Sequence, residues 1–169
     1  MKKIKRKIHV IGLNSFKIED LSLEVQELFH KVKNIAAPNS YIHEIENWVS
    51  MKYIEEKIFY RSKSNLDLIN WLRSTNNDVI LISRGDPLWF GIGRILLNKF
   101  SKEELLFYPG KTSLQLAFSR LKKSWQDIKA VSIHGRETNE LIKLLKLKEK
   151  GIAILTDPKN NNLELIRKN

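Results

Sequence analysis

Short apolar runs alternate along the chain with segments whose apolar residues recur every three or four positions. The runs at 8–11, 79–82 and 105–108 have the length and composition of buried strands. Segments 21–32 and 66–72 follow the spacing of one helix face. Strands that alternate with helices in this way predict an α/β fold with a largely parallel sheet.

Weaker patterns complete the first part of the chain. Asn34–Ala37 is expected to form a short strand that ends at Pro38, and a helix is expected through 42–49. Another short strand is predicted near 57–60. Either Asp20 or Ser22 can cap the helix at 21–32, and Ser64 can cap the helix at 66–72, because their side-chain oxygens accept bonds from first-turn amides.

The second part repeats the alternation. The strand at 105–108 leads into a turn at 109–113 that opens a helix over 114–121. Strands at 130–133 and 151–155 flank a helix that begins at Thr138 or Asn139. We therefore expect an N-terminal α/β lobe at 1–108 and a partial C-terminal α/β lobe at 109–169.

Several predicted strands end in small, polar or proline-containing turns. Ligands of open parallel sheets bind at the carboxyl ends of the strands, so these turns predict one binding edge. They are Gly12, Gly85-Asp86-Pro87, Pro109-Gly110, His134-Gly135-Arg136 and Thr156-Asp157-Pro158.

The stretch SRGDPLWFGIGR, residues 83–94, is the most informative of these turns. Asp86 can cap a following helix, and Pro87 suits the first helical position, where no amide hydrogen is needed. Gly91 and Gly93 would then lie inside that helix, where each glycine costs about 1 kcal/mol relative to alanine. Such glycines indicate close packing or a close ligand approach.

Composition narrows the possible chemistry. The 169 residues are 42% hydrophobic, include no cysteine and carry a net charge of +11, so we expect an anionic partner and no disulfide or thiolate site. Charge alone fits nucleic acid, an acidic protein, a membrane surface or a polycarboxylated small molecule. The sequence lacks nucleic-acid-binding motifs and an apolar run of about 18 residues, and the four histidines lack metal-ligand spacing. We expect a cytoplasmic protein that binds no nucleic acid, membrane or metal.

Three segments together resemble the tetrapyrrole methylase family. They are SRGDPLWFGIGR, YPGKTSLQLAFSRLKKSWQDIKAVSIHGR and AILTDPKNN. Within the family they are most similar to the C5-methylating part of the precorrin-6Y C5,15-methyltransferase branch of cobalamin synthesis. The resemblance runs in order from about Val10 to Asn162.

The resemblance implies two α/β lobes that bind S-adenosylmethionine between them, and a homodimer. It also implies a set of cofactor contacts and, near the substrate, His134 and Arg136. The implied cofactor-binding residues are Gly12, Leu13, Gly85, Asp86, Pro87, Trp89, Thr112, Ser113, Leu114, Leu155 and Thr156.

The implied reaction is methyl transfer from S-adenosylmethionine to C5, a ring carbon of a precorrin or cobalt-precorrin. Arg84 and Arg136 are candidates to bind the carboxylates of this anionic tetrapyrrole, because guanidinium pairs bidentately with carboxylate. His134 and Asp86 are the candidate general bases.

Two departures from the family pattern support a second hypothesis. The first loop usually reads G-x-G-P-G-D, but here Gly12 is followed by LNSFK, and the second lobe is expected to be truncated. The alternative is a catalytically degenerate or fragmentary methylase-like protein that binds a tetrapyrrole or a partner subunit. In either case, a separate subunit is expected for the C15 methylation and decarboxylation.

Overall fold

The computed structural model describes residues 6–14, 20–52, 56–134 and 137–156. The chain divides into two compact units, Met1–Thr112 and Ser113–Asn169. Each unit is described by itself below.

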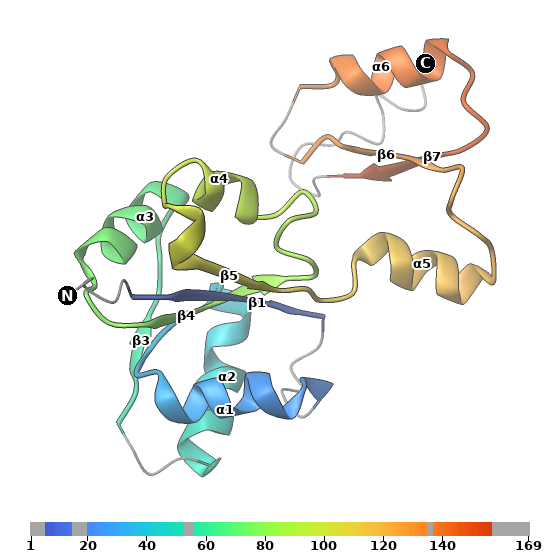
Figure 1. Cartoon of the computed structure of the whole chain (residues 1–169). Helices are drawn as coiled ribbons and strands as arrows, with labels where there is room; N and C mark the ends of the chain where they lie inside the picture. Colours follow the sequence, from blue (N-terminus) through green and yellow to red (C-terminus); the bar gives the residue numbers. More distant parts are fainter. Residues whose placement is uncertain (1–5, 15–19, 53–55, 135–136, 157–169) are drawn as a thin grey trace. The chain divides into compact units, whose positions relative to one another are not determined.

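The first unit is a parallel sheet with helices on both faces (Figure 1). The strand order is β3-β2-β4-β1-β5, and each described strand pair is parallel, as the alternating pattern predicted. Its helices and strands are β1 (Ile8–Leu13), α1 (Leu23–Lys31), β2 (Asn34–Ala36), α2 (Asn39–Lys52), β3 (Ile58–Tyr60), α3 (Asn65–Ser74), β4 (Val79–Arg84), α4 (Gly93–Leu97) and β5 (Leu105–Tyr108).

Strand alternation divides the core of this unit into two layers. Ile11 and Ile82 face one cluster, which α1 and α2 cover with residues such as Phe29. Val10 and Leu81 face the other cluster, which α3 and α4 cover. Figure 1 shows the same arrangement, with α1 and α2 on one face of the sheet and α3 and α4 on the other. Because both faces are covered, β1 and β4 are buried along nearly their whole length, which is typical of central parallel strands.

Two of the predicted helix caps are confirmed. The Ser22 Oγ accepts a hydrogen bond from the Val25 amide at 3.4 Å, so Ser22 rather than Asp20 caps α1. The Ser64 Oγ accepts one from the Asp67 amide at 3.1 Å at the start of α3. Each serine satisfies a first-turn amide that has no partner within its helix.

The predicted helix directly after β4 is wrong. The chain forms turns through 85–92, and the five-residue α4 begins only at Gly93. Consequently Asp86 does not cap an α-helix, Pro87 is not its first residue, and Gly91 does not lie within it. The Gly93 amide donates to the Pro87 carbonyl at 2.8 Å, and a Cβ at Gly91 or Gly93 would lie 2.6 Å from that oxygen. Both glycines therefore let the chain fold back onto Pro87.

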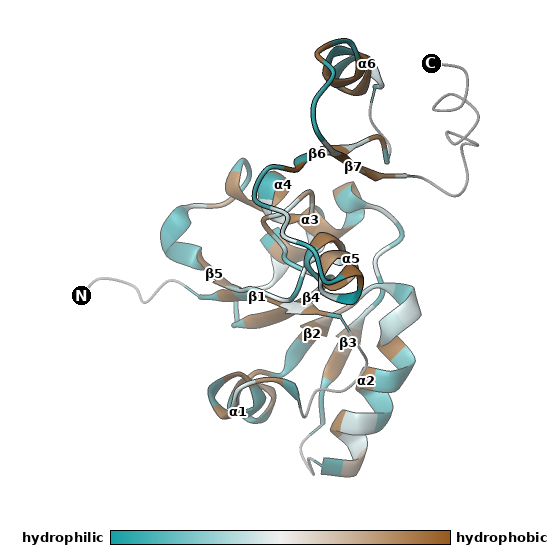
Figure 2. Cartoon of the chain, turned by 90° about the vertical axis from the view of Figure 1, so that its right-hand side faces the viewer, coloured by the Kyte–Doolittle hydropathy of each residue, from teal (hydrophilic) through white to brown (hydrophobic). Residues whose placement is uncertain are grey.

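The second unit contains a short parallel pair of strands with helices. Its elements are α5 (Ser113–Leu121), β6 (Lys129–Ser132), α6 (Asn139–Lys146) and β7 (Ile152–Leu155). Val131, Ile133 and Leu141 form its small buried core. In Figure 2, hydrophobic residues are prominent along β6 and β7. Across the described residues, none of the helices has the length and apolar character needed to cross a membrane.

Candidate functional site

The carboxyl ends of β1, β4 and β5 meet at three glycines, which we call the glycine junction: Gly12, Gly85 and Gly110. A Cβ at Gly12 would lie 2.0 Å from the Gly85 carbonyl oxygen and 2.5 Å from the Gly110 nitrogen. A Cβ at Gly110 would lie 2.7 Å from the Gly12 carbonyl oxygen. Only residues without a side chain allow three backbones to approach this closely, so the junction packs the ends of three strands directly against one another.

Gly85 has a second reason to be glycine. Its φ is +59°, in the left-handed region that other residues rarely adopt. Its amide donates to the Leu13 carbonyl at 2.8 Å, which fixes the turn after β4 against the end of β1. The Leu13 side chain is only 3% exposed and packs in the core, so Leu13 contributes to the site through its backbone rather than its side chain.

Asp86 shapes the turn that follows Gly85. Its Oδ1 accepts a hydrogen bond from the Leu88 amide at 2.8 Å, and its carbonyl accepts one from the Trp89 amide at 3.2 Å. Short bonds of this kind between an aspartate and amides two or three residues later stabilise tight turns. The carboxylate therefore has a structural role, and Pro87 is buried beside it.

The loop after β5 closes on the same edge of the sheet. The Asn14 side-chain amide donates to the Lys111 carbonyl, and a Cβ at Gly85 would lie 3.3 Å from that same oxygen. Thr112, the last residue of this loop, is buried. Gly110 belongs to one of the turns that the sequence predicted at the binding edge, although it is not among the predicted cofactor-binding residues. Asn14 was not predicted, because nothing in the sequence pairs it with a residue 97 positions away.

Arg84 ends β4 beside the junction and is exposed. One of its guanidinium nitrogens donates to the Ser40 Oγ at 2.5 Å, and its Cζ lies 5.2 Å from the centre of the Tyr41 ring. Both partners lie in the first turn of α2, which follows the end of β2. The exposed arginine is therefore held against the first turn of α2 at the carboxyl edge.

Ser83 places an unsatisfied hydroxyl at the same end of β4. It pairs in register with Gly12 and is 7% exposed. Its Oγ is buried, and it has no hydrogen-bond partner among the described residues. Buried polar atoms are normally bonded, so this hydroxyl is suited to a polar ligand group or water at the strand end.

The other predicted site residues lie in the second unit. Ser113 and Leu114 begin α5, and Leu114 is buried. The Ile133 amide donates to the Leu155 carbonyl at 2.9 Å, so the ends of β6 and β7 lie side by side. His134 lies two residues after β6 and Thr156 directly follows β7, and both are exposed. Arg136 lies outside the described residues.

A buried histidine lies in the sheet that carries the junction. The His9 Nδ1 is 3.0 Å from the Tyr108 hydroxyl, and the two rings stack. Burial is the main cause that lowers the pKa of His9, with Lys7 lowering it further and Asp78 opposing this. Burial also raises the pKa of Tyr108, and Glu24 adds to this effect. Both groups are therefore neutral near pH 7. The described residues contain no group of three or more side chains suited to hold a metal ion.

Comparison with known proteins gives a consistent match. The family model described as Tetrapyrrole (Corrin/Porphyrin) Methylases matches residues 7–169. A probable cobalt-precorrin-7 C(5)-methyltransferase from Methanocaldococcus jannaschii is 34% identical over 94 residues, which cover 54% of this chain and 44% of that protein. A decarboxylating precorrin-6Y C(5,15)-methyltransferase from Sinorhizobium sp is 40% identical over 58 residues, which cover 34% of this chain and 14% of that protein. The match thus spans less than half of each relative.

Solved structures support the fold. A cobalamin biosynthesis precorrin-6Y methylase from Archaeoglobus fulgidus superposes with a TM-score of 0.67 at 22% identity, covering 94% of this chain and 77% of that one. The methyltransferase CobJ gives a TM-score of 0.73 at 18% identity, covering 97% and 76%. At these identities the likeness establishes the fold alone, an α/β arrangement with a parallel sheet.

Proposed function

The chain belongs to the tetrapyrrole (corrin/porphyrin) methylase family, and from this premise we propose that it is an S-adenosylmethionine-dependent C-methyltransferase. The substrate is a precorrin or cobalt-precorrin of cobalamin biosynthesis, and the acceptor is ring carbon C5. The names of the two curated relatives support this choice of acceptor. The observation that carries the proposal is the glycine junction, which lies where open α/β sheets bind their ligands.

The residues at the junction fit S-adenosylmethionine. The backbones of Gly12, Leu13 and Gly85-Asp86-Pro87 lie together at this edge of the sheet, and the buried Ser83 hydroxyl has no hydrogen-bond partner among the described residues. We assign the cofactor to these residues, with Trp89 and Thr112 beside them. Resemblance adds Ser113, Leu114, Leu155 and Thr156 of the second unit as candidate contacts. The bound cofactor supplies a methyl group that its sulfonium has already activated.

Because the methyl group is activated, the chain mainly has to orient the acceptor carbon and exclude water. The rigid backbone contacts at the junction are suited to fix a donor in one place. A base is needed where the acceptor carbon carries a proton. His134 and Asp86 are our candidates, and the bond from the Leu88 amide gives the Asp86 carboxylate a structural role as well.

The substrate is expected to bind through its carboxylates. The net charge of +11 favours an anionic ligand, and Arg84 lies one residue from the junction. We propose Arg84 and Arg136 as carboxylate-binding residues, since a guanidinium fork matches a carboxylate. The Sinorhizobium relative is named for methylation at two positions with decarboxylation, whereas this chain matches 14% of it. We propose that a separate subunit acts at C15 and, from the family resemblance, that the chain itself forms a homodimer.

A transfer assay tests the proposal. The purified chain is incubated with methyl-labelled S-adenosylmethionine and a precorrin-7-type substrate, and the product is examined by NMR. We expect label at C5. A folded chain that binds both compounds but transfers no methyl group would contradict the enzyme proposal.

That same outcome would favour the second candidate, a methylase-like binding protein. The observation in its favour is the first loop, where Asn14 follows Gly12-Leu13 and bonds to the Lys111 carbonyl. This bond ties the loops after β1 and β5 together. A binding protein would retain tetrapyrrole affinity without any turnover.

A further inference from the structure

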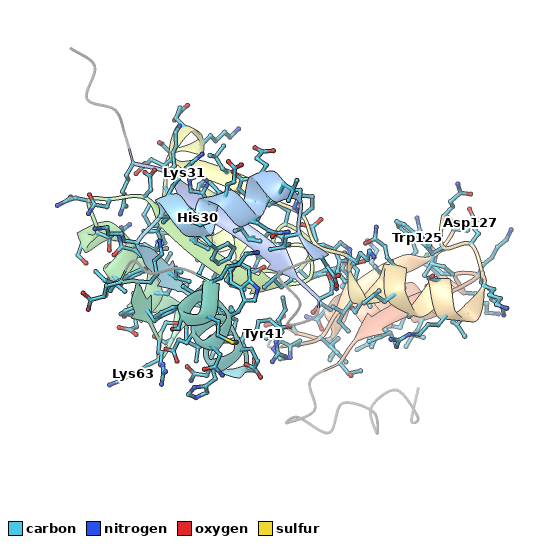
Figure 3. All side chains as sticks on the ribbon, turned by 90° about the horizontal axis from the view of Figure 1, so that it is seen from below. His30, Lys31, Tyr41, Lys63, Trp125 and Asp127 are labelled. Atoms are coloured by element: carbon cyan, nitrogen blue, oxygen red, sulfur yellow. The ribbon has the colours of Figure 1, made fainter. Side chains whose placement is uncertain are left out.

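Arg84 is held by two neighbours in a manner that the proposed function does not yet explain. Its guanidinium donates to the Ser40 Oγ at 2.5 Å and lies 5.2 Å from the centre of the Tyr41 ring (Tyr41 is labelled in Figure 3). A cation over an aromatic face is attracted by the ring, and a hydrogen bond to a charged donor is stronger than a neutral one. Together the two contacts restrict the conformations of a long side chain.

The holding residues are themselves fixed. Tyr41 is 8% exposed and packs in the core cluster that α1 and α2 cover. Its amide donates to the Pro38 carbonyl at 2.8 Å, which anchors the start of this 14-residue helix. Ser40, one residue earlier, takes its position from the same turn. The guanidinium is thus held by a buried ring and by a hydroxyl at the start of α2.

Arg84 has no carboxylate partner among the described residues. Arg61 pairs with both Glu46 carboxylate oxygens at 2.7 Å, and Arg6 lies 3.8 Å from Glu104. Arg84 forms no such ion pair with any described residue, and the first turn of α2 contains no acidic residue. A guanidinium has five N–H donors, so those not used by Ser40 remain available to an external anion.

We propose that Ser40 and Tyr41 are positioning residues that hold Arg84 ready for a peripheral carboxylate of the tetrapyrrole. The inference rests on the proposed function, because it assumes that the polycarboxylated substrate binds at this edge. Arg84 immediately precedes Gly85, so the bound carboxylate lies next to the glycine junction. Ser40 and Tyr41 act only through Arg84, and this distinguishes them from residues that touch the substrate.

Binding of uroporphyrin, a stable polycarboxylated porphyrin, tests the inference without turnover. Fluorescence titration of the full chain gives the dissociation constant for wild type, Arg84→Gln, Ser40→Ala, Tyr41→Leu and Tyr41→Phe. We expect Arg84→Gln to weaken binding about tenfold, and Ser40→Ala and Tyr41→Leu about three- to tenfold. Tyr41→Phe keeps the ring and should restore near-wild-type affinity. S-adenosylmethionine affinity should stay unchanged in all four variants.

A double-mutant cycle makes the test specific. Ser40→Ala should have no further effect in the Arg84→Gln background, since its role passes through the arginine. Arg73→Gln, which removes an exposed arginine at the end of α3, is the matched control and should bind like wild type. Additive losses, or equal losses in Arg73→Gln, would overturn the inference. If Tyr41→Leu fails to fold, Ser40→Ala and the cycle still decide.

The two proposals fail differently. Arg84-dependent porphyrin binding without methyl transfer would overturn the enzymatic proposal and leave the role of Ser40 and Tyr41 intact. Methyl transfer with wild-type substrate KM in Ser40→Ala and Arg84→Gln would overturn the role of Ser40 and Tyr41 and leave the enzymatic proposal intact. Absence of tetrapyrrole binding by the folded wild-type chain would overturn both.

Discussion

At the scale of single residues, Gly12 illustrates why the site depends on backbone contacts. A Cβ added to Gly12 would lie 2.0 Å from the Gly85 carbonyl oxygen and 2.5 Å from the Gly110 nitrogen. Both are backbone atoms, which cannot rotate away. Gly151 provides a contrast, since a Cβ there would meet side-chain atoms of Ile128, the Cδ1 at 2.5 Å and the Cγ1 at 3.9 Å. The end of a flexible side chain can move at small cost, whereas three joined strand ends cannot.

This contrast predicts the effect of adding one methyl group. Gly12→Ala should lower the free energy of unfolding by about 2 to 3 kcal/mol, because overpacking forces backbone shifts. Gly151→Ala should change it by less than about 1 kcal/mol, because Ile128 can adopt another rotamer. Urea unfolding followed by circular dichroism measures both. Equal losses in the two variants would show that the junction is not tightly packed.

His9 makes the stability of the first unit depend on pH. Burial lowers the folded-state pKa of His9 below its ordinary value of 6.5. Below about pH 6.5, His9 therefore takes up a proton more readily in the unfolded chain than in the folded chain. The contribution of neutral His9 is fully present above about pH 6.5 and is lost as the pH falls through the lower folded-state pKa.

We expect His9→Gln to reduce this dependence, because glutamine stays neutral at every pH. Urea midpoints measured at pH 7.5 and at pH 5 should differ less in the variant than in wild type. His30→Gln, on an exposed residue of α1, is the control and should behave like wild type. An unchanged difference in His9→Gln would mean that other groups cause the acid sensitivity.

The sequence identified the residues of the junction only in part. Gly12 directly follows a short apolar run and Gly85 lies three residues after another, and a glycine at the end of a buried strand is a strong local signal. Ser40 and Tyr41 gave no such signal. Their contacts with Arg84 join positions 44 and 43 residues apart and depend on β2 lying beside β4. Local patterns predict which strands form, but not which two strands become neighbours.

At the scale of secondary structure, the strands were easier to predict than the segment after β4. Apolar runs bounded by polar turns left little ambiguity for β1, β4 and β5. In residues 85–93, however, the order of Asp, Pro and apolar residues resembles a capped helix. The bond from the Leu88 amide to Asp86 and the fold-back of Gly93 onto Pro87 form turns instead, and they delay α4 to Gly93.

The Asp86 turn leads to a prediction that separates structure from proton transfer. Asp86→Asn keeps an oxygen that can accept the Leu88 amide, whereas Asp86→Ala removes it. We expect Asp86→Ala to lower the free energy of unfolding by about 1 kcal/mol and to weaken S-adenosylmethionine binding, with Asp86→Asn near wild type in both. Methyl transfer that persists in Asp86→Asn would assign the base to another group. Loss of transfer in a folded, cofactor-binding Asp86→Asn would support Asp86 as the base.

At the scale of the whole molecule, the sequence predicted the fold class because the alternation of strands and helices extends along most of the chain. The predicted site residues are divided between the two units, with Gly12, Gly85 and Thr112 in the first and Ser113 and His134 in the second. The parallel sheet of the first unit explains how residues far apart in sequence reach one edge. The resemblance, rather than any local pattern, supplied the identity of the cofactor and substrate.

The most direct test of the central claim is calorimetric titration of the full chain with S-adenosylmethionine, and with S-adenosylhomocysteine in parallel. We predict binding of one molecule per chain with micromolar affinity. Gly12→Ala, studied at a temperature where it remains folded, should bind much more weakly, while Gly151→Ala should bind like wild type. A folded wild-type chain that binds neither compound would contradict the assignment of the glycine junction as a cofactor site.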